Sequence, residues 1–257
     1  VLGRYVPGLE FLSVLLGDEP ALTPQQRLYN RLLSKDASAA IHQIEDANAQ
    51  SSIAKTSDEI VLPALQLASA DYDLDRLDDK QLSSMQETVD LITAAFAGTD
   101  GLEATAVTQK QAPILVVPAR GPIDRMAAHY LASLLNTATL YQVTTSGAAG
   151  LTALADLRAT AKKGDSQPQI VIATTGPSAS AQLKLIVKRA ASYFPASPIF
   201  VIGADGNFPG AEMESIPGHW MRIGQLIELI NSKRQPNPGR IPDAPPLTEP
   251  IPLEAAT

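Results

Sequence analysis

Apolar side chains recur at two different periods along this chain, and the change falls near residue 112. Up to residue 97 they recur three and four positions apart, which predicts amphipathic helices. Beyond residue 112 they form short continuous runs separated by amphipathic stretches, the pattern of buried parallel strands that alternate with helices. The sequence therefore predicts a small helical bundle followed by an α/β region.

Four helices are expected in the first region. The first begins at Thr23-Pro24, because threonine can cap a helix, proline suits the first helical position, and Gln26 can complete a capping box. The others are expected over residues 36–48, 57–70 and 79–97. In the third helix Asp58 and Glu59 fall in the first turn, where the helix dipole favours negative charge.

Five strands are expected in the second region, at residues 114–117, 140–144, 169–173, 198–202 and 219–223. Helices are expected between and after them, over residues 121–135, 148–163, 176–193 and 225–233. This alternation predicts a doubly wound, five-stranded parallel sheet of the flavodoxin-like or cobalamin-binding-like kind.

The chain divides into four predicted parts. They are a membrane-proximal apolar segment (1–21), a cap-like helical bundle (22–110), a parallel α/β domain (111–234) and a proline-rich tail (235–257) that is disordered or extended. The opening residues lack an initiator methionine and a charged leader, so we expect that another segment precedes them.

Composition narrows the possible functions. Hydrophobic residues make up 45% of the chain, which is enough to bury a core. The net charge is -7 and no basic cluster is visible, which argues against nucleic acid as a partner. The complete lack of cysteine excludes disulfides and cysteine-based chemistry and fits the cytosol. Residues 1–110 carry 8 basic and 17 acidic side chains, so the negative charge lies in the helical part.

Ligands of open parallel sheets bind beyond the carboxyl ends of the strands, where the strand order reverses. With the order 2-1-3-4-5, this point lies between the first and third strands, and each is followed by a Gly-Pro that starts a helix, at Gly121 and Gly176. Two helix N-termini would then face one crevice and favour a small polar or anionic ligand. The candidate ligand-binding residues are Arg120, Gly121, Asp124, Thr174, Thr175, Gly176, Ser178 and Gly203.

The same residues are consistent with a purely structural role. Asp124 and Ser178 are ordinary residues for the start of a helix, and Gly-Pro is an ordinary way to begin one. The alternating aspartates of residues 71–75 resemble the start of a calcium loop, but the central glycine and the final glutamate are missing, so a solvated connection is expected.

Known catalytic patterns are absent from the sequence. It has no dinucleotide-binding glycine fingerprint, no Walker loop and no Gly-x-Ser-x-Gly elbow. His42, His129 and His219 lie far apart, without the spacing of metal ligands. No catalytic residue, metal site or cofactor is therefore predicted.

A helical cap followed by a five-stranded parallel domain is similar to the cobalamin-binding modules of the methionine-synthase type. In that family Asp-x-His-x-x-Gly follows the first strand, and its histidine binds cobalt. The matching stretch here, residues 120–125, contains no histidine. Thr174 stands near the family's serine position, and Gly203-Ala204 replaces its Gly-Gly.

Nearly the whole chain resembles the cytosolic C-terminal extension of the bacterial autoinducer-2 exporter family of permeases. The matching stretches are residues 1–7, 9–12, 15–24, 29–33 and 120–124. The resemblance implies a regulatory or ligand-sensing region at the cytoplasmic face of the inner membrane, joined to a transmembrane part of the same polypeptide. It also makes a homo-oligomer plausible.

The sequence thus favours a non-enzymatic accessory domain of a membrane transporter. Two alternatives stay open at this point. One is a free-standing binding module for a small ligand or a cobalamin-like cofactor. The other is an enzyme that works through Asp124 and Arg120.

Overall fold

The computed structural model describes residues 22–97, 113–139, 141–160, 168–176, 181–203 and 218–232. The predicted membrane-proximal segment, the proline-rich tail and the candidate residue Ser178 lie outside these ranges. Within them no helix is long and apolar enough to cross a bilayer.

The first part of the chain is helical. Its helices are α2 (Pro24–Leu33), α3 (Ala37–Gln50), α4 (Ile53–Thr56), α5 (Leu62–Asp73) and α6 (Asp79–Phe96). The capping box predicted at Thr23 and Gln26 is confirmed, since each side chain bonds the backbone N–H of the other residue. A second capping box, made by Asp78 and Gln81, starts α6.

The third predicted helix begins earlier than expected and is wider in its middle. Ser52 caps it by accepting a bond from the backbone N–H of Lys55 at 3.2 Å, so the helix starts at Ile53 and not at Ser57. Between α4 and α5 it widens into a π-helical segment, Ser57–Val61. Pro63 lies two residues beyond this segment and has no N–H to donate, which explains the local departure from α-helical bonding. Asp58 consequently lies in the π-helical segment and not in the first turn of this helix.

The second part is a five-stranded sheet in the order β2-β1-β3-β4-β5, with every neighbouring pair parallel. The strands are β1 (Ile114–Pro118), β2 (Val143–Thr145), β3 (Gln169–Thr174), β4 (Ile199–Gly203) and β5 (His219–Met221). The predicted doubly wound α/β class is confirmed. Strand β5 is shorter than expected, because Ile223 already begins the next helix, α10 (Ile223–Ser232).

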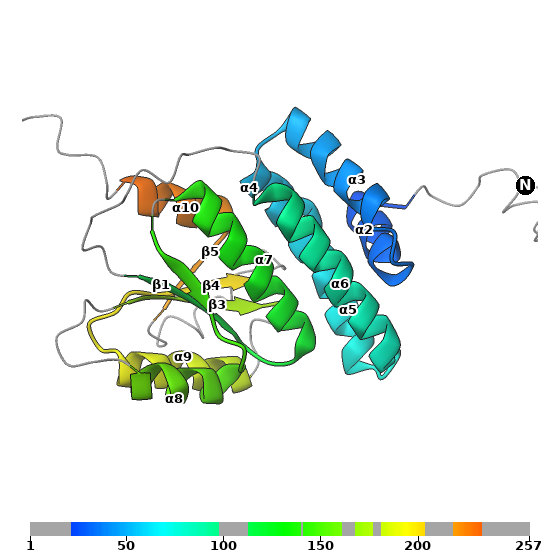
Figure 1. Ribbon diagram of the computed structural model, residues 1–257. Helices are drawn as coiled ribbons and strands as arrows, with labels where there is room; N and C mark the ends of the chain where they lie inside the picture. Colours follow the sequence, from blue (N-terminus) through cyan, green and yellow to red (C-terminus); the bar gives the residue numbers. More distant parts are fainter. Residues whose placement is uncertain are drawn as a thin grey trace, which may run out of the picture.

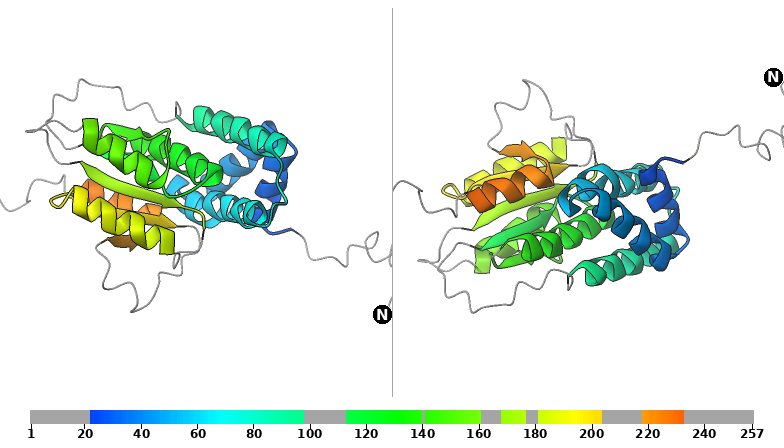
Figure 2. Two further views of the ribbon diagram at one scale, coloured as in Figure 1. Left: turned by 90° about the horizontal axis from the view of Figure 1, so that it is seen from below. Right: turned by 90° about the horizontal axis from the view of Figure 1, so that it is seen from above.

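The molecule has four layers (Figure 1). Helices α8 (Gly150–Thr160) and α9 (Ala181–Tyr193) cover one face of the sheet, and α7 (Pro122–Ala138) and α10 cover the other. The helical bundle packs against α7 and α10, with α6 and α5 contacting α7 and α4 contacting α10. Views from below and above show the bundle beside this second helical layer (Figure 2).

Two clusters of buried side chains stabilise these layers. The larger cluster runs without a break from Leu28 in α2 through Met126 in α7 to Ile230 in α10. The smaller cluster joins the opposite face of the sheet to α8 and α9, with Leu154 and Ile186 among its buried members. The bundle and one face of the sheet therefore share a hydrophobic core.

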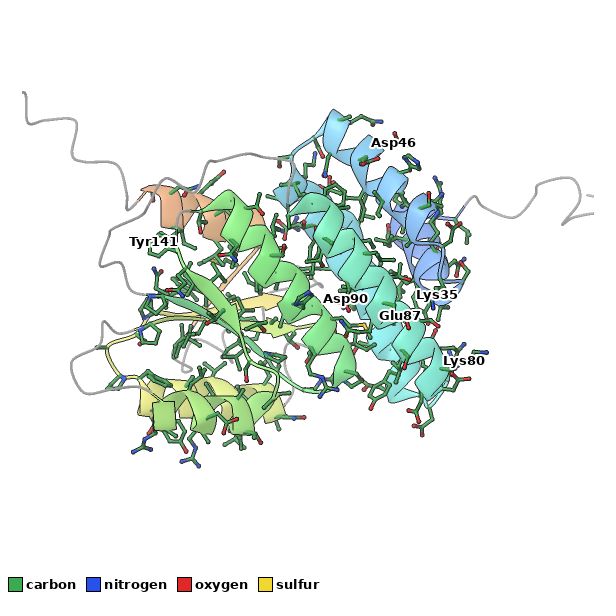
Figure 3. The ribbon with its side chains drawn as sticks, viewed as in Figure 1. Lys35, Asp46, Lys80, Glu87, Asp90 and Tyr141 are labelled. Carbon is green, nitrogen blue, oxygen red and sulfur yellow. The ribbon has the colours of Figure 1, made fainter. Side chains whose placement is uncertain are left out.

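Charged side chains on the bundle surface form several pairs. Lys35 pairs with Glu87, and Asp90 in α6 faces His129 of α7 at 3.6 Å (Figure 3). In the last turn of α5, Asp71 accepts a hydrogen bond from the Tyr29 hydroxyl at 2.7 Å, which lowers the pKa of the Asp71 carboxyl. No group of acidic or histidine side chains in the described ranges is arranged to hold a metal ion.

Candidate functional site

The sheet brings the two predicted Gly-Pro turns together. Strands β1 and β3 are neighbours, with Pro118 opposite Ala173, and the backbone N–H of Ala119 donates to the carbonyl of Ala173 at 2.9 Å. Gly121 lies three residues after Pro118, and Gly176 lies two residues after Thr174, the last residue of β3. The reversal of strand order lies between them, as the order 2-1-3-4-5 requires.

Asp124, in the first turn of α7, joins the two turns. Its Oδ1 atom accepts one hydrogen bond from the backbone N–H of Thr175 at 2.7 Å and a second from the Thr175 hydroxyl at 2.6 Å. Both side chains are almost fully buried, with exposed fractions of 2% for Asp124 and 1% for Thr175. Thr174 is also buried and pairs with Gly203 between β3 and β4, which places both at the same edge of the sheet.

The surroundings of Asp124 have two opposing effects on the pKa of its carboxyl. Burial raises the pKa of its carboxyl, while the bonds from Thr175 and the nearby charge of Arg120 lower it. The Oδ2 atom is buried and makes no hydrogen bond, and its nearest cation is Nε of Arg120 at 3.7 Å. A buried carboxylate oxygen without a hydrogen bond is a costly arrangement, and a proton or a ligand donor would relieve it.

Arg120 connects the α/β part to the helical bundle. Its Nη2 donates to the Ser69 hydroxyl of α5 at 3.0 Å, and its Nη1 lies 3.3 Å from Oδ2 of Asp73. The guanidinium lies over Gly176, where a Cβ atom would be only 2.1 Å from Nη2. A side chain at residue 176 would therefore occupy the space of the guanidinium, and Arg120 would have to move aside.

An open cavity of about 220 Å³ adjoins these groups. It lies between the end of α5 and the start of α7, and it is lined by Ser69, Tyr72, Asp73, Arg120, Gly121, Ile123, Asp124 and Gln182. The gap between the two turns is filled by Arg120 and Asp124 themselves. The open space is therefore displaced from the predicted crevice toward the bundle.

Sequence reasoning missed the residues that the bundle contributes to this site. Ser69, Tyr72 and Asp73 belong to α5, far from the Gly-Pro turns in sequence, and Gln182 belongs to α9. The run of aspartates at residues 71–75 was a usable signal, because unpaired acidic residues at a helix end attract a cation from another element.

Comparison with known proteins gives little further information. No protein-family model matches the chain, and no curated protein matches it significantly. Among solved structures it is similar to the methanol:cobalamin methyltransferase complex MtaBC from Methanosarcina barkeri, with 10% sequence identity, a TM-score of 0.34 and 90% of each chain covered. A TM-score this low does not establish a common fold, so the fold class rests on the strand order. The resemblance to the exporter family stays a prediction.

The described residues do not fit a protein-ligated cobalamin. His42 pairs with Glu45 on the surface of α3, and His129 faces Asp90. His219 begins β5 and lies beside the ring of Phe200. None of these imidazoles is at the carboxyl end of β1, where the family's cobalt ligand would belong, and Arg120 is the large polar side chain at that position.

Proposed function

We propose that this chain is a regulatory domain of a membrane transporter that senses a small anionic ligand at Arg120. The observation that carries the proposal is the position of the Arg120 guanidinium. It bonds the bundle through Ser69, approaches Asp124 at the switch point of the sheet, and borders an open cavity of about 220 Å³.

An anion in this cavity can compete for Arg120. The contact between Arg120 and Asp73 is long, at 3.3 Å, and the Asp73 side chain is 45% exposed, so the pair is weak and replaceable. A carboxylate or phosphate group would bind the guanidinium with shorter, charge-assisted hydrogen bonds. Occupancy would then release Asp73 and change how α5 is held against the α/β part.

The charge of the site sets the conditions for binding. When Asp73 and Asp124 are both ionised, their two negative charges exceed the single positive charge of Arg120. Since burial raises the pKa of Asp124, an approaching anion favours its protonated form. We therefore expect the anion to bind more tightly as the pH falls, with uptake of a proton.

The connection to a transporter is supported by the resemblance to the exporter family. On this proposal the natural polypeptide continues into a transmembrane part, and the domain lies at the cytoplasmic face of the bacterial inner membrane. The natural reading frame should encode hydrophobic spans upstream of Val1. If it does not, the same site would belong to a free-standing binding module.

Ligand binding is tested by thermal unfolding and calorimetry with inorganic phosphate, citrate and pyruvate. A ligand that binds only the folded state stabilises it by about 2.7 kcal/mol at a hundredfold excess over Kd. Arg120→Gln should abolish the effect, whereas Arg125→Gln, which removes an exposed charge from the same helix, should retain it. No stabilisation of the unaltered protein by any anion would overturn the sensing proposal.

A further inference from the structure

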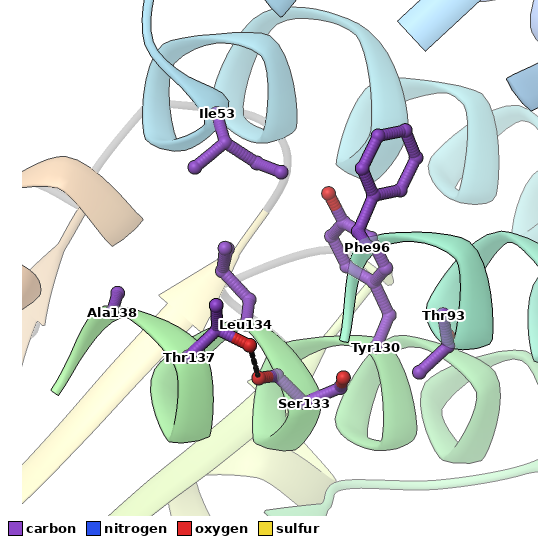
Figure 4. Close-up of a pocket in the computed structure, with 8 residues that line it drawn as sticks. All are labelled: Ile53, Thr93, Phe96, Tyr130, Ser133, Leu134, Thr137 and Ala138. Atoms are coloured by element: carbon purple, nitrogen blue, oxygen red, sulfur yellow. Dashed lines mark hydrogen bonds between the residues drawn. The ribbon is translucent and has the colours of Figure 1, made fainter. Parts of the chain in front are cut away.

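A second cavity lies on the other half of the interface between the bundle and α7 (Figure 4). Its volume is about 50 Å³, several times the roughly 10–15 Å³ that one water molecule needs. Ile53 of α4, Phe96 of α6 and Leu134 of α7 are among its lining residues. We propose that this cavity binds a short aliphatic chain.

The hydroxyl groups of the two threonines that line the cavity bond backbone carbonyls of their own helices. The Thr93 hydroxyl donates to the carbonyl of Val89 at 2.7 Å, and the Thr137 hydroxyl donates to the carbonyl of Ser133 at 3.1 Å. Each threonine therefore leaves its methyl group as the part free to contact a ligand. A water molecule needs two to four polar partners, so this lining favours an apolar occupant.

The floor of the cavity is buried, and its rim is accessible. Leu134 and Tyr130 are 5% and 3% exposed. The Tyr130 hydroxyl bonds Ser57 at 2.6 Å, which joins this wall to the π-helical segment of the bundle. Phe96 and Ala138 are only partly buried. A chain can enter between them and bury its end against Leu134.

This geometry predicts a limit on chain length. Each methylene moved from water into an apolar site contributes about 0.8 kcal/mol, which corresponds to roughly fourfold in affinity. The affinity should rise along a series of linear alcohols and stop rising when the chain outgrows the cavity. Partition onto a nonspecific apolar surface would continue to strengthen with length.

The test is a titration of the whole chain with linear alcohols from 1-propanol to 1-octanol, followed by methyl NMR. Saturable shifts are expected at Ile53 and Leu134, and no shift at Leu183, which lies in the separate core under α9. Ala138→Leu should fill the cavity and weaken 1-pentanol binding at least about tenfold. Arg125→Leu adds the same side chain at an exposed position of the same helix and should leave binding unchanged.

If Ala138→Leu does not fold, Ser133→Leu fills the same cavity from the preceding turn of α7. The proposal is overturned if the unaltered protein shows no saturable shift, if Leu183 shifts equally, or if a folded cavity-filling variant binds 1-pentanol as well as the unaltered protein does.

Discussion

Asp58 caps a helix that begins 165 positions later in the chain, at Ile223. Its Oδ1 atom accepts from the backbone N–H of Ile223 at 2.9 Å, and its Oδ2 atom accepts from Gly224 at 3.2 Å. The first N–H groups of a helix have no partner within the helix, and a carboxylate there also complements the helix dipole. One side chain of the bundle thus completes the start of α10.

Replacement of Asp58 by alanine should destabilise the protein by about 1–3 kcal/mol, because two partly buried N–H groups would lose their acceptor. Chemical denaturation measures this change. The control is Glu59→Ala at the neighbouring position, whose side chain is half exposed and whose contact with Lys55 is 4.0 Å long. The control should change the stability by less than about 0.5 kcal/mol. Equal effects of the two substitutions would contradict the capping role.

Gly176→Ala should displace Arg120, because the new Cβ would lie 2.1 Å from Nη2. The guanidinium is the end of a flexible side chain and can move aside, so the expected cost is the loss of its contacts with Ser69 and Asp73, about 0.5–1.5 kcal/mol. The matched control is Gly147→Ala, since a Cβ there meets nothing within 4 Å. Thermal unfolding of the two variants makes the comparison, and a Gly176→Ala protein as stable as Gly147→Ala would show that the contacts of Arg120 with Ser69 and Asp73 do not stabilise the fold.

The stability of the protein should depend on pH through Asp124. Because its pKa is raised in the folded state, the folded protein holds this proton more tightly than the unfolded chain does. The resulting stabilisation is complete below the unfolded pKa, near 3.8, and is lost as the pH rises through the higher folded pKa. Asp124→Asn removes this titration.

We therefore expect that, between pH 3.5 and 8, the unfolding free energy of the unaltered protein falls relative to that of Asp124→Asn as the pH rises. A relative unfolding free energy that rises with pH would mean that the bonds from Thr175 and the charge of Arg120 lower the pKa of Asp124 by more than burial raises it.

The hydroxyls of Ser57 and Tyr130 should be coupled energetically. They lie 2.6 Å apart between the bundle and α7, and burial raises the pKa of Tyr130 to about 12, so this phenol stays protonated at neutral pH. A double-mutant cycle of Ser57→Ala and Tyr130→Phe should give a coupling energy of about 0.5–1.5 kcal/mol. Additive effects would show that the two groups do not stabilise each other.

The regular parts of the fold were predictable because their signals are local. Thr23 and Gln26 form the expected capping box, and the buried runs at residues 114–117 and 169–173 became β1 and β3. The early start of the third helix was predictable in principle from Ser52, a good N-cap residue. The capping of α10 by Asp58 was not, because a contact between residues 165 positions apart leaves no periodic signal.

Only the part of the candidate site that follows from the strand order was predictable from the sequence. The strand order brought Gly121 and Gly176 together at the reversal point, which follows from topology. The hydrogen bonds between Asp124 and Thr175 and the bond from Arg120 to Ser69 depend on how the layers pack. Packing between layers is set by many side chains at once, so a single sequence does not reveal it.

Helix α7 is enclosed on both sides, by the sheet and by the bundle, and most of its residues are buried. Asp124 near its start belongs to the polar site, and Ala138 at its end belongs to the apolar cavity. At 1.5 Å per residue, Asp124 and Ala138 are about 21 Å apart along one continuous helix. If filling either end alters the affinity of the other, thermodynamic reciprocity requires the influence to run equally in both directions.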